Sequence, residues 1–264
     1  MENKKLISFD LKAEFGFLKK PDINDGLYLT YNMLHKPVLI GILGAIIGLQ
    51  GYQENGKFPE YYNRLKDLKV GISPLCSDKG NFQKDIVKYN NGTGFASAEA
   101  GGNLIVAEQM LIKPSYRCYL FLDMGNDDEK YIYDYLKNNR AEFLPYLGKN
   151  DFSAWWDNFV EYKFSLFDFS TDYKISSIFS KTNAVSQYVV KSMSVFSSEE
   201  PVWLYFEKLP MGFDEKLYQY YYGDFVYSNA TFKAEMNMSD TGCFYRLQSK
   251  DTNKNDFQII QLFA

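Results

Sequence analysis

Apolar and polar residues alternate regularly along the first half of this chain, between segments rich in turn-forming residues. Residues 6–15 follow the two-residue period of a half-buried strand, and residues 115–123 show the clearest strand pattern in the chain. Residues 65–75 predict another strand. The apolar run 37–49 is too short for a bilayer span, which needs about 20 apolar residues, and Pro37 suits the first turn of a helix. The pattern therefore predicts a strand, a buried helix and two further strands.

A long hairpin is predicted between residues 82 and 112. Its strands are residues 82–89 and 103–112, and its tip, residues 90–102, contains four glycines. A hairpin of this length cannot pack entirely on one domain, so we expect it to protrude.

The predicted helix has glycines on one face. Gly41, Gly44 and Gly48 are spaced at i, i+3 and i+7, although each glycine lowers helix stability by about 1 kcal/mol. They do not form the GxxxxGK[ST] pattern of a nucleotide-binding loop. We therefore expect them to permit close packing, with the sheet as the partner.

A second helix and a further strand follow residues 115–123. Residues 125–129 supply a cap and an acidic first turn for a helix that runs to about residue 139. A fourth strand after Trp156 would complete a ferredoxin-like βαββαβ unit, with the hairpin as an insertion.

The remainder of the chain has short strand patterns and no long helical period. Its end, residues 242–247 and 257–263, predicts a closing hairpin. We therefore predict an α+β fold, with a ferredoxin-like domain in residues 1–156 and a small β-rich region in residues 157–264.

Composition supports a strand-rich protein and limits its partners. Tyr and Phe number 22 each in 264 residues, and aromatic residues suit pleated, half-buried surfaces. The net charge is −4 and the pI is about 5.2, whereas proteins that bind nucleic acid alone are usually basic. Any nucleic-acid role must therefore use a local basic patch or a site shared with other chains.

Cysteine and histidine usage argues against metal chemistry. Cys76, Cys118 and Cys243 lie far apart without CxxC spacing, which indicates a reducing cytoplasm and neither a disulfide framework nor a thiolate zinc site. His35 is the one histidine, which excludes a multi-histidine metal site. We expect no metal, no cofactor, no export signal and no membrane association.

Three stretches carry a resemblance to a known family. They are residues 7–12 (ISFDLK) with Thr30-Tyr31 and residues 35–49, residues 111–119 (LIKPSYRCY), and residues 145–149 (PYLGK). In this order and spacing the chain resembles the Cas-five family of CRISPR-associated proteins, of the RAMP superfamily, in the form found in type I-B systems. The similarity covers most of residues 5–160.

The resemblance implies a subunit of Cascade, the RNA-guided surveillance complex of antiviral defence. Members of the family cap the 5′ handle of the guide RNA (crRNA). They contact the Cas-seven-type backbone subunit and the Cas-eight-type large subunit, which recognises target DNA. Their ferredoxin-like (RRM-like) domain carries a β-hairpin thumb, and residues 82–112 match that insertion in position and glycine content.

Two segments contain the first candidate RNA-binding residues. His35 and Lys36 directly precede the glycine helix, where free N–H groups favour a phosphate; a solvated loop is the alternative. Lys113, Tyr116 and Arg117 flank or enter the strand after the hairpin. Strand alternation places Tyr116 and Arg117 on opposite faces, so one should reach RNA and the other the core, and Arg binds phosphate bidentately and stacks on bases.

Further candidates come from the hairpin and two loops. By the resemblance, Gly148 allows close backbone approach and Lys149 pairs with phosphate, while Lys84 and Lys88 contact RNA on the thumb. The remaining candidates are Lys19, Lys20 and Tyr31, and for the lysine pair a solvated surface is the simpler interpretation.

We predict no catalytic residue. One branch of the family cuts precursor crRNA with a tyrosine, a lysine and a histidine that follows the lysine near the strand after the thumb. Here that stretch reads Ile112-Lys113-Pro114-Ser115, without the histidine. Two alternatives stay open: a metal-independent endoribonuclease that processes precursor crRNA, and a structural protein of a phage or secretion system with a β-rich shell.

Overall fold

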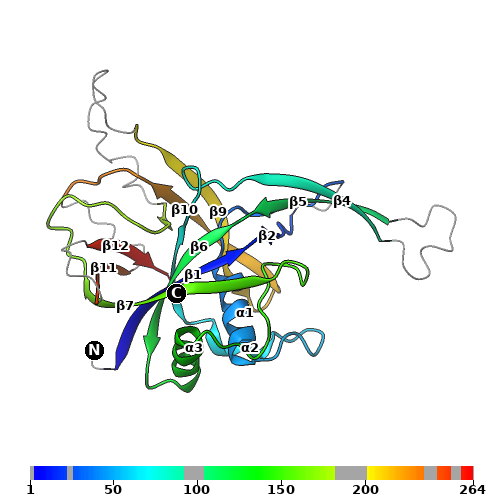
Figure 1. The fold of residues 1–264 in the computed structure, drawn as a ribbon, viewed down its shortest axis with the longest axis horizontal. Coiled ribbons are helices and arrows are strands. Elements are labelled where there is room, and N and C mark those ends of the chain that lie inside the picture. The colour runs from blue at the N-terminus through cyan, green and yellow to red at the C-terminus, as the bar shows by residue number, and fades with distance from the viewer. Residues whose placement is uncertain are drawn as a thin grey trace.

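The predicted strands form a central antiparallel sheet, in a computed structural model that describes residues 3–22, 26–91, 104–181, 201–234, 243–250 and 257–263 (Figure 1). The sheet order is β12-β11-β7-β1-β6-β3, and the ladders between β1, β3, β6, β7, β11 and β12 are antiparallel. Its strands are β1 (Lys4–Ala13), β3 (Lys69–Pro74), β6 (Ser115–Asp123), β7 (Ala154–Leu166), β11 (Cys243–Ser249) and β12 (Gln258–Leu262).

The helices pack on one side of this sheet (Figure 1). They are α1 (Lys36–Ile47), α2 (Glu60–Leu65) and α3 (Asp127–Lys137). Ile7, Phe9 and Leu11 of β1 share the main hydrophobic core with helix residues, whereas Asp10 and its even-numbered neighbours face the other side. The predicted cap of α3 is confirmed, because the Asn126 side chain accepts hydrogen bonds from backbone N–H groups of the first turn.

The glycines of α1 pack against α2, and the predicted contact with the sheet is wrong. A Cβ on Gly44 would lie 2.4 Å from the Cβ of Tyr61, and one on Gly41 would lie 3.5 Å from the Tyr61 ring. Gly48 is the C-cap of α1, with a φ of +83° that suits glycine. The glycines therefore serve contact between two helices and the end of α1.

The predicted hairpin is confirmed in its described strands. It consists of β4 (Lys84–Asn91) and β5 (Leu104–Ile112), which pair antiparallel, and it extends away from the rest of the fold (Figure 1). At its base β5 also pairs with β2 (Phe15–Gly16), which follows β1. Most of the predicted tip lies outside the described residues.

The C-terminal part of the chain is β-rich as predicted. A further sheet has the order β8-β10-β9, formed by β8 (Phe179–Ser180), β9 (Leu204–Asp214) and β10 (Gln219–Ser228). Leu209 and Phe225 of this sheet belong to the main core. The closing hairpin is present as β11 and β12, which pair antiparallel.

The proposed domain boundary, between residues 156 and 157, lies inside β7. This strand begins at Ala154, slightly earlier than predicted, and β11 pairs with it to extend the central sheet. The division into two domains stays a prediction. In the described part of the chain, no helix has the length and apolar character needed to cross a bilayer.

Candidate nucleic-acid interface

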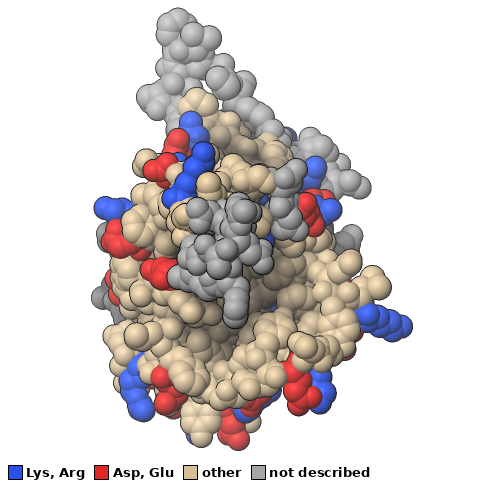
Figure 2. Space-filling view, turned by 90° about the vertical axis from the view of Figure 1, so that its right-hand side faces the viewer, with Lys and Arg blue, Asp and Glu red and all other residues tan. Residues whose placement is uncertain are grey.

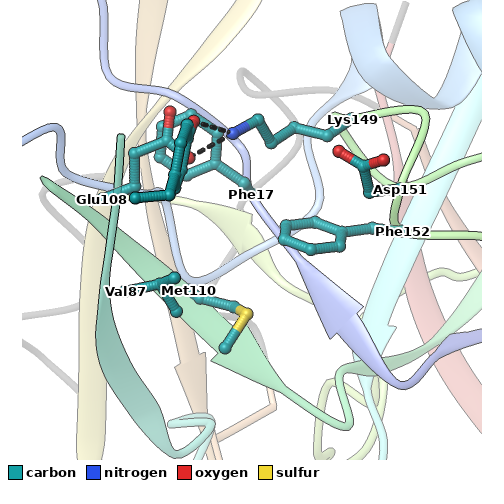
Figure 3. A pocket seen from close by; sticks show the side chains of 8 residues that line it. Phe17, Val87, Glu108, Met110, Lys149, Asp151 and Phe152 are labelled. Atoms are coloured by element: carbon teal, nitrogen blue, oxygen red, sulfur yellow. Dashed lines mark hydrogen bonds and ion pairs between the residues drawn. The ribbon is translucent and has the colours of Figure 1, made fainter. Parts of the chain in front are cut away.

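Lys149 lies in a pocket at the base of the hairpin (Figure 3). Its ammonium group donates to the Glu108 carboxylate and to the Tyr89 hydroxyl, both on the hairpin, and lies 4.6 Å from the centre of the Tyr89 ring. The cavity has a volume of about 340 Å³, and it is lined by Phe17, Val87, Tyr89, Glu108, Met110, Lys149, Asp151 and Phe152. Lys149 therefore connects the loop that precedes β7 to the hairpin.

The charge of Lys149 is balanced within the protein. Glu108 is buried, with only 7% of its surface exposed. Burial alone would lower the pKa of Lys149, but hydrogen bonds to Glu108 and Tyr89 outweigh it and raise the pKa. A phosphate that binds Lys149 must therefore compete with Glu108.

Gly148 allows the main chain of Phe17 to approach this loop closely. Its φ is +89°, and a Cβ at this position would lie 1.8 Å from the Phe17 carbonyl oxygen. The Phe17 N–H donates to the Leu147 carbonyl at 3.1 Å, which fixes the loop against the chain after β2. The close approach at Gly148 in this structure is made by the protein's own main chain, and the approach of RNA stays a prediction.

Four predicted residues gather around Asn32, in the segment before α1. The Lys84 ammonium donates to the Asn32 side-chain carbonyl at 2.9 Å. Lys20 Nζ lies 5.1 Å from the Tyr31 ring centre, and the rings of Tyr31 and His35 are 5.2 Å apart. The fold thus brings together residues from three segments of the sequence: Lys20, the pair Tyr31 and His35, and Lys84.

Glu207 of β9 holds this segment in place. Its carboxylate accepts hydrogen bonds from the backbone N–H groups of Asn32 at 3.0 Å and Met33 at 2.9 Å, and from the Tyr205 hydroxyl at 2.9 Å. It also lies 3.7 Å from Lys20 Nζ. Sequence reasoning missed Glu207, because no local pattern links it to residues about 175 positions earlier.

His35 and Lys36 are buried, which corrects the prediction that they face RNA before the glycine helix. They are 3% and 2% exposed. His35 Nδ1 has no hydrogen-bond partner among the described residues, and burial lowers the pKa of His35 to about 3. Burial also lowers the pKa of Lys36 to about 8, against the attraction of Asp67. Neither side chain is available at the surface in this conformation.

Tyr116 and Arg117 lie on opposite faces of β6, as the alternation predicted. Tyr116 is fully buried, so the candidate contact with RNA is corrected: its hydroxyl donates to the Asn32 carbonyl at 2.6 Å. Arg117 donates from Nε and Nη2 to the two carboxylate oxygens of Asp10, at 2.7 Å and 2.9 Å. These hydrogen bonds outweigh burial and raise the pKa of Arg117, so this cation also has an internal partner.

Lys88, Lys113 and Lys19 are exposed. Lys88 and Lys113 have no ion pair with any described residue, and Lys19 Nζ lies 3.9 Å from the Tyr28 ring centre. Figure 2, a view onto the hairpin end of the molecule, shows Lys and Arg side chains next to Asp and Glu, without a broad patch of one sign. Positively charged side chains on this face are therefore interspersed with acidic ones and do not form a broad basic surface.

Metal ligation has no support in the geometry of the described residues. Within those ranges, His, Cys, Asp and Glu side chains form no group of three or more that is arranged to hold a metal ion.

Comparisons with known proteins give matches to solved structures alone. No family model and no curated protein matches this sequence. A chain of a CRISPR RNA-guided surveillance complex aligns with a TM-score of 0.45 and 13% identity, over 86% of this chain and 91% of that chain. A chain of the Type III-B Cmr-beta structure with cognate target RNA and AMPPnP aligns with a TM-score of 0.44 and 11% identity, over 97% and 99%. A CRISPR protein from Archaeoglobus fulgidus aligns with a TM-score of 0.43 and 9% identity, also over 97% and 99%.

Proposed function

We propose that this chain is a non-catalytic subunit of a type I CRISPR Cascade complex, in the cytoplasm, that binds and caps the 5′ handle of the crRNA. The order of strands and helices and the sheet segment β7-β1-β6-β3 fit a ferredoxin-like unit. The observation that carries the proposal is the protruding β4–β5 hairpin between β3 and β6 (Figure 1). This is the position of the thumb in the Cas-five family, which the three sequence stretches resemble.

The charge distribution favours RNA binding that is shared with other subunits. The chain is acidic overall, and Lys149 and Arg117 are paired with Glu108 and Asp10. A single chain with few free cations releases few counterions on binding RNA, so its own affinity is low. The handle would therefore be held jointly with a Cas-seven-type backbone subunit, next to a Cas-eight-type large subunit that engages target DNA.

Exposed lysines on and next to the hairpin are the best candidates for phosphate contacts. Lys88 is an exposed side chain of β4, and Lys113 is exposed between β5 and β6. Lys149 would join them if a phosphate replaced Glu108 as its partner. Base-specific recognition is not assigned to any of these residues.

The absence of catalysis is part of the proposal. A general acid or base must reach the proton that it transfers. His35 is 3% exposed, and its low pKa leaves the imidazole neutral at pH 7. A metal-free cleavage assay on precursor crRNA tests this: we expect no product, and cleavage that is lost in His35→Ala would establish the endoribonuclease alternative.

Crosslinking within the assembled complex tests handle binding. The chain is coexpressed with backbone and large subunits and crRNA, and guide RNA is crosslinked by ultraviolet light. We expect crosslinks from this chain to the 5′ handle, and fewer of them in Lys88→Glu/Lys113→Glu. Lys130→Glu, an exposed charge reversal on α3, is the matched control. A particle that excludes this chain, or RNA crosslinks to every other subunit but this one, would overturn the proposal.

A further inference from the structure

A second pocket is lined in part by the loop that contains Lys149. Its cavity has a volume of about 300 Å³ between α1, the 145–148 loop and the β9–β10 sheet. Its lining includes four tyrosines, Tyr52, Tyr61, Tyr146 and Tyr220, together with Phe213. Aromatic side chains thus surround a space in the size range of small-ligand sites.

The lining of this tyrosine pocket contains no charged side chain. The remaining lining residues are Pro37, Val38, Gly41, Ile42, Ala45, Pro145 and Gly148. A phosphate or a carboxylate would lose its hydration here without gaining a countercharge, which is unfavourable. A flat, uncharged ring system matches this lining better, because it can stack on the tyrosine faces.

The four tyrosine hydroxyls supply polar groups at this pocket. None of the four hydroxyls has a hydrogen bond to any described residue in the structure. Burial, together with the proximity of other tyrosine hydroxyls, Tyr52 among them, raises the pKa of Tyr220 to about 12. A tyrosine hydroxyl can both donate and accept hydrogen bonds, as the edge of a nucleobase requires.

Gly148 and Lys149 place this pocket beside the candidate phosphate contact. Gly148 lines the tyrosine pocket, and Lys149, the next residue, lines the pocket at the hairpin base. Consecutive Cα atoms are about 3.8 Å apart, so the two pockets adjoin neighbouring residues of the same loop.

We propose that the tyrosine pocket binds one unpaired nucleobase of the RNA, turned out of its stack, between the rings of Tyr52, Tyr146 and Tyr61. The inference rests on the proposed function and adds a base-binding site to it. Tyr52 and Tyr146, which are 62% and 45% exposed, form the entrance, while Tyr61 is held against α1 by Gly41 and Gly44. Base–aromatic stacking of this kind strengthens binding roughly fivefold to a hundredfold per base.

Fluorescent base analogues in the assembled particle test the proposal. A 2-aminopurine or a pyrrolocytosine is placed at each handle position in turn, and stacking on tyrosine quenches its emission. We expect one position to be quenched in the wild-type particle and to recover emission in Tyr52→Ala/Tyr146→Ala, with RNA affinity weaker by about fivefold to a hundredfold. Tyr131→Ala, which removes an exposed ring from α3, should leave the emission unchanged.

A second pair of variants fills the pocket without removing a ring. Gly41→Leu places a side chain in the cavity and should restore emission at the same position. Gly41→Ala is its control, because the added Cβ would lie at an ordinary 3.5 Å from Tyr61. Equal quenching in the wild type, in Tyr52→Ala/Tyr146→Ala and in Gly41→Leu would overturn the base-binding site. If these particles contain crRNA, the proposed function would still stand. A wild-type particle without crRNA would instead overturn the proposed function and the pocket assignment with it.

Discussion

Arg117 and Asp10 form an ion pair across β1 and β6, and removing the arginine tests whether it is structural or an RNA ligand. The two residues are direct partners in the strand register, and two hydrogen bonds of 2.7 Å and 2.9 Å join them. Arg117→Met removes the guanidinium but keeps an unbranched apolar stem. The Asp10 side chain is only 8% exposed. In the variant its carboxylate would still accept a hydrogen bond from the neutral Asn158 amide at 2.9 Å, but it would have lost its positively charged partner.

The expected loss of stability follows from this burial. Breaking a buried ion pair by removing one partner costs about 3–5 kcal/mol, because the other charge stays in place uncompensated. Since 22% of the Arg117 side chain is exposed, solvent reaches part of the pair, and we expect the lower end, about 3 kcal/mol. For a chain of this size that corresponds to a Tm lower by about 6–12 °C.

Urea unfolding of Arg117→Met, Asp10→Asn and the double variant measures the pair directly. We expect a coupling free energy of about 1.5 kcal/mol or more, with the double variant more stable than the sum of the single changes predicts. A loss below about 1 kcal/mol in Arg117→Met would refute the structural reasoning. An unchanged stability together with loss of crRNA from the particle would make Arg117 an RNA ligand.

Three further predictions follow from local geometry. Gly148→Ala should lower the unfolding free energy by about 3 kcal/mol or more in chemical unfolding. Gly26→Ala is the control, because Gly26 also has a positive φ but nothing lies within 4 Å of the added Cβ, and it should cost only about 1–2 kcal/mol. Equal losses would contradict the clash with Phe17. Burial lowers the pKa of His35 to about 3, so between pH 6.5 and 3 the unfolded chain binds a proton that the folded chain does not. The unfolding free energy should therefore fall as the pH decreases through this range, by up to about 1.4 kcal/mol per pH unit. His35→Phe should show a shallower decline, and parallel pH curves would count against it. Burial lowers the pKa of Lys36 to about 8, so the charge of its ammonium group destabilises the fold at pH 7. Lys36→Met should therefore raise the unfolding free energy at pH 7 by about 1–3 kcal/mol. A decrease would show that the ammonium group has a stabilising partner.

Local patterns in the sequence predicted most of the central sheet and the hairpin. The strand at residues 115–123 has the predicted bounds, and the Asn126 cap begins α3 where the acidic turn indicated. These elements were predictable because strand alternation and helix capping depend on neighbouring residues. What a face packs against depends on distant ones, so the glycines of α1 pointed to close packing but not to Tyr61 as its partner.

The candidate site was less predictable, because sequence shows charges but not their partners. Arg117 lies in the predicted strand and Lys149 in the loop before β7, yet both are paired internally. The Arg117 partner was within reach of sequence reasoning, since the two predicted strands carry charges of opposite sign, and the register of the structure places Asp10 opposite Arg117. Glu207 and the tyrosine pocket could not, because they combine segments whose relative positions no local pattern fixes.

The pairing of these cations changes what kind of RNA contact the chain can offer. A lysine already bonded to a buried carboxylate gives up that bond when it meets a phosphate, so the net gain is small unless neighbouring chains add positive charge. Stacking in an uncharged pocket has no such competitor, and it adds little to the salt dependence, which comes from the release of counterions at phosphate contacts. If both contacts operate, rising salt should release the phosphate contacts first, and the base in the tyrosine pocket should be the last part of the handle held by this chain. Under the proposed function, the acidic net charge limits the phosphate contacts that this chain can make alone, so that positive charge from other subunits is needed.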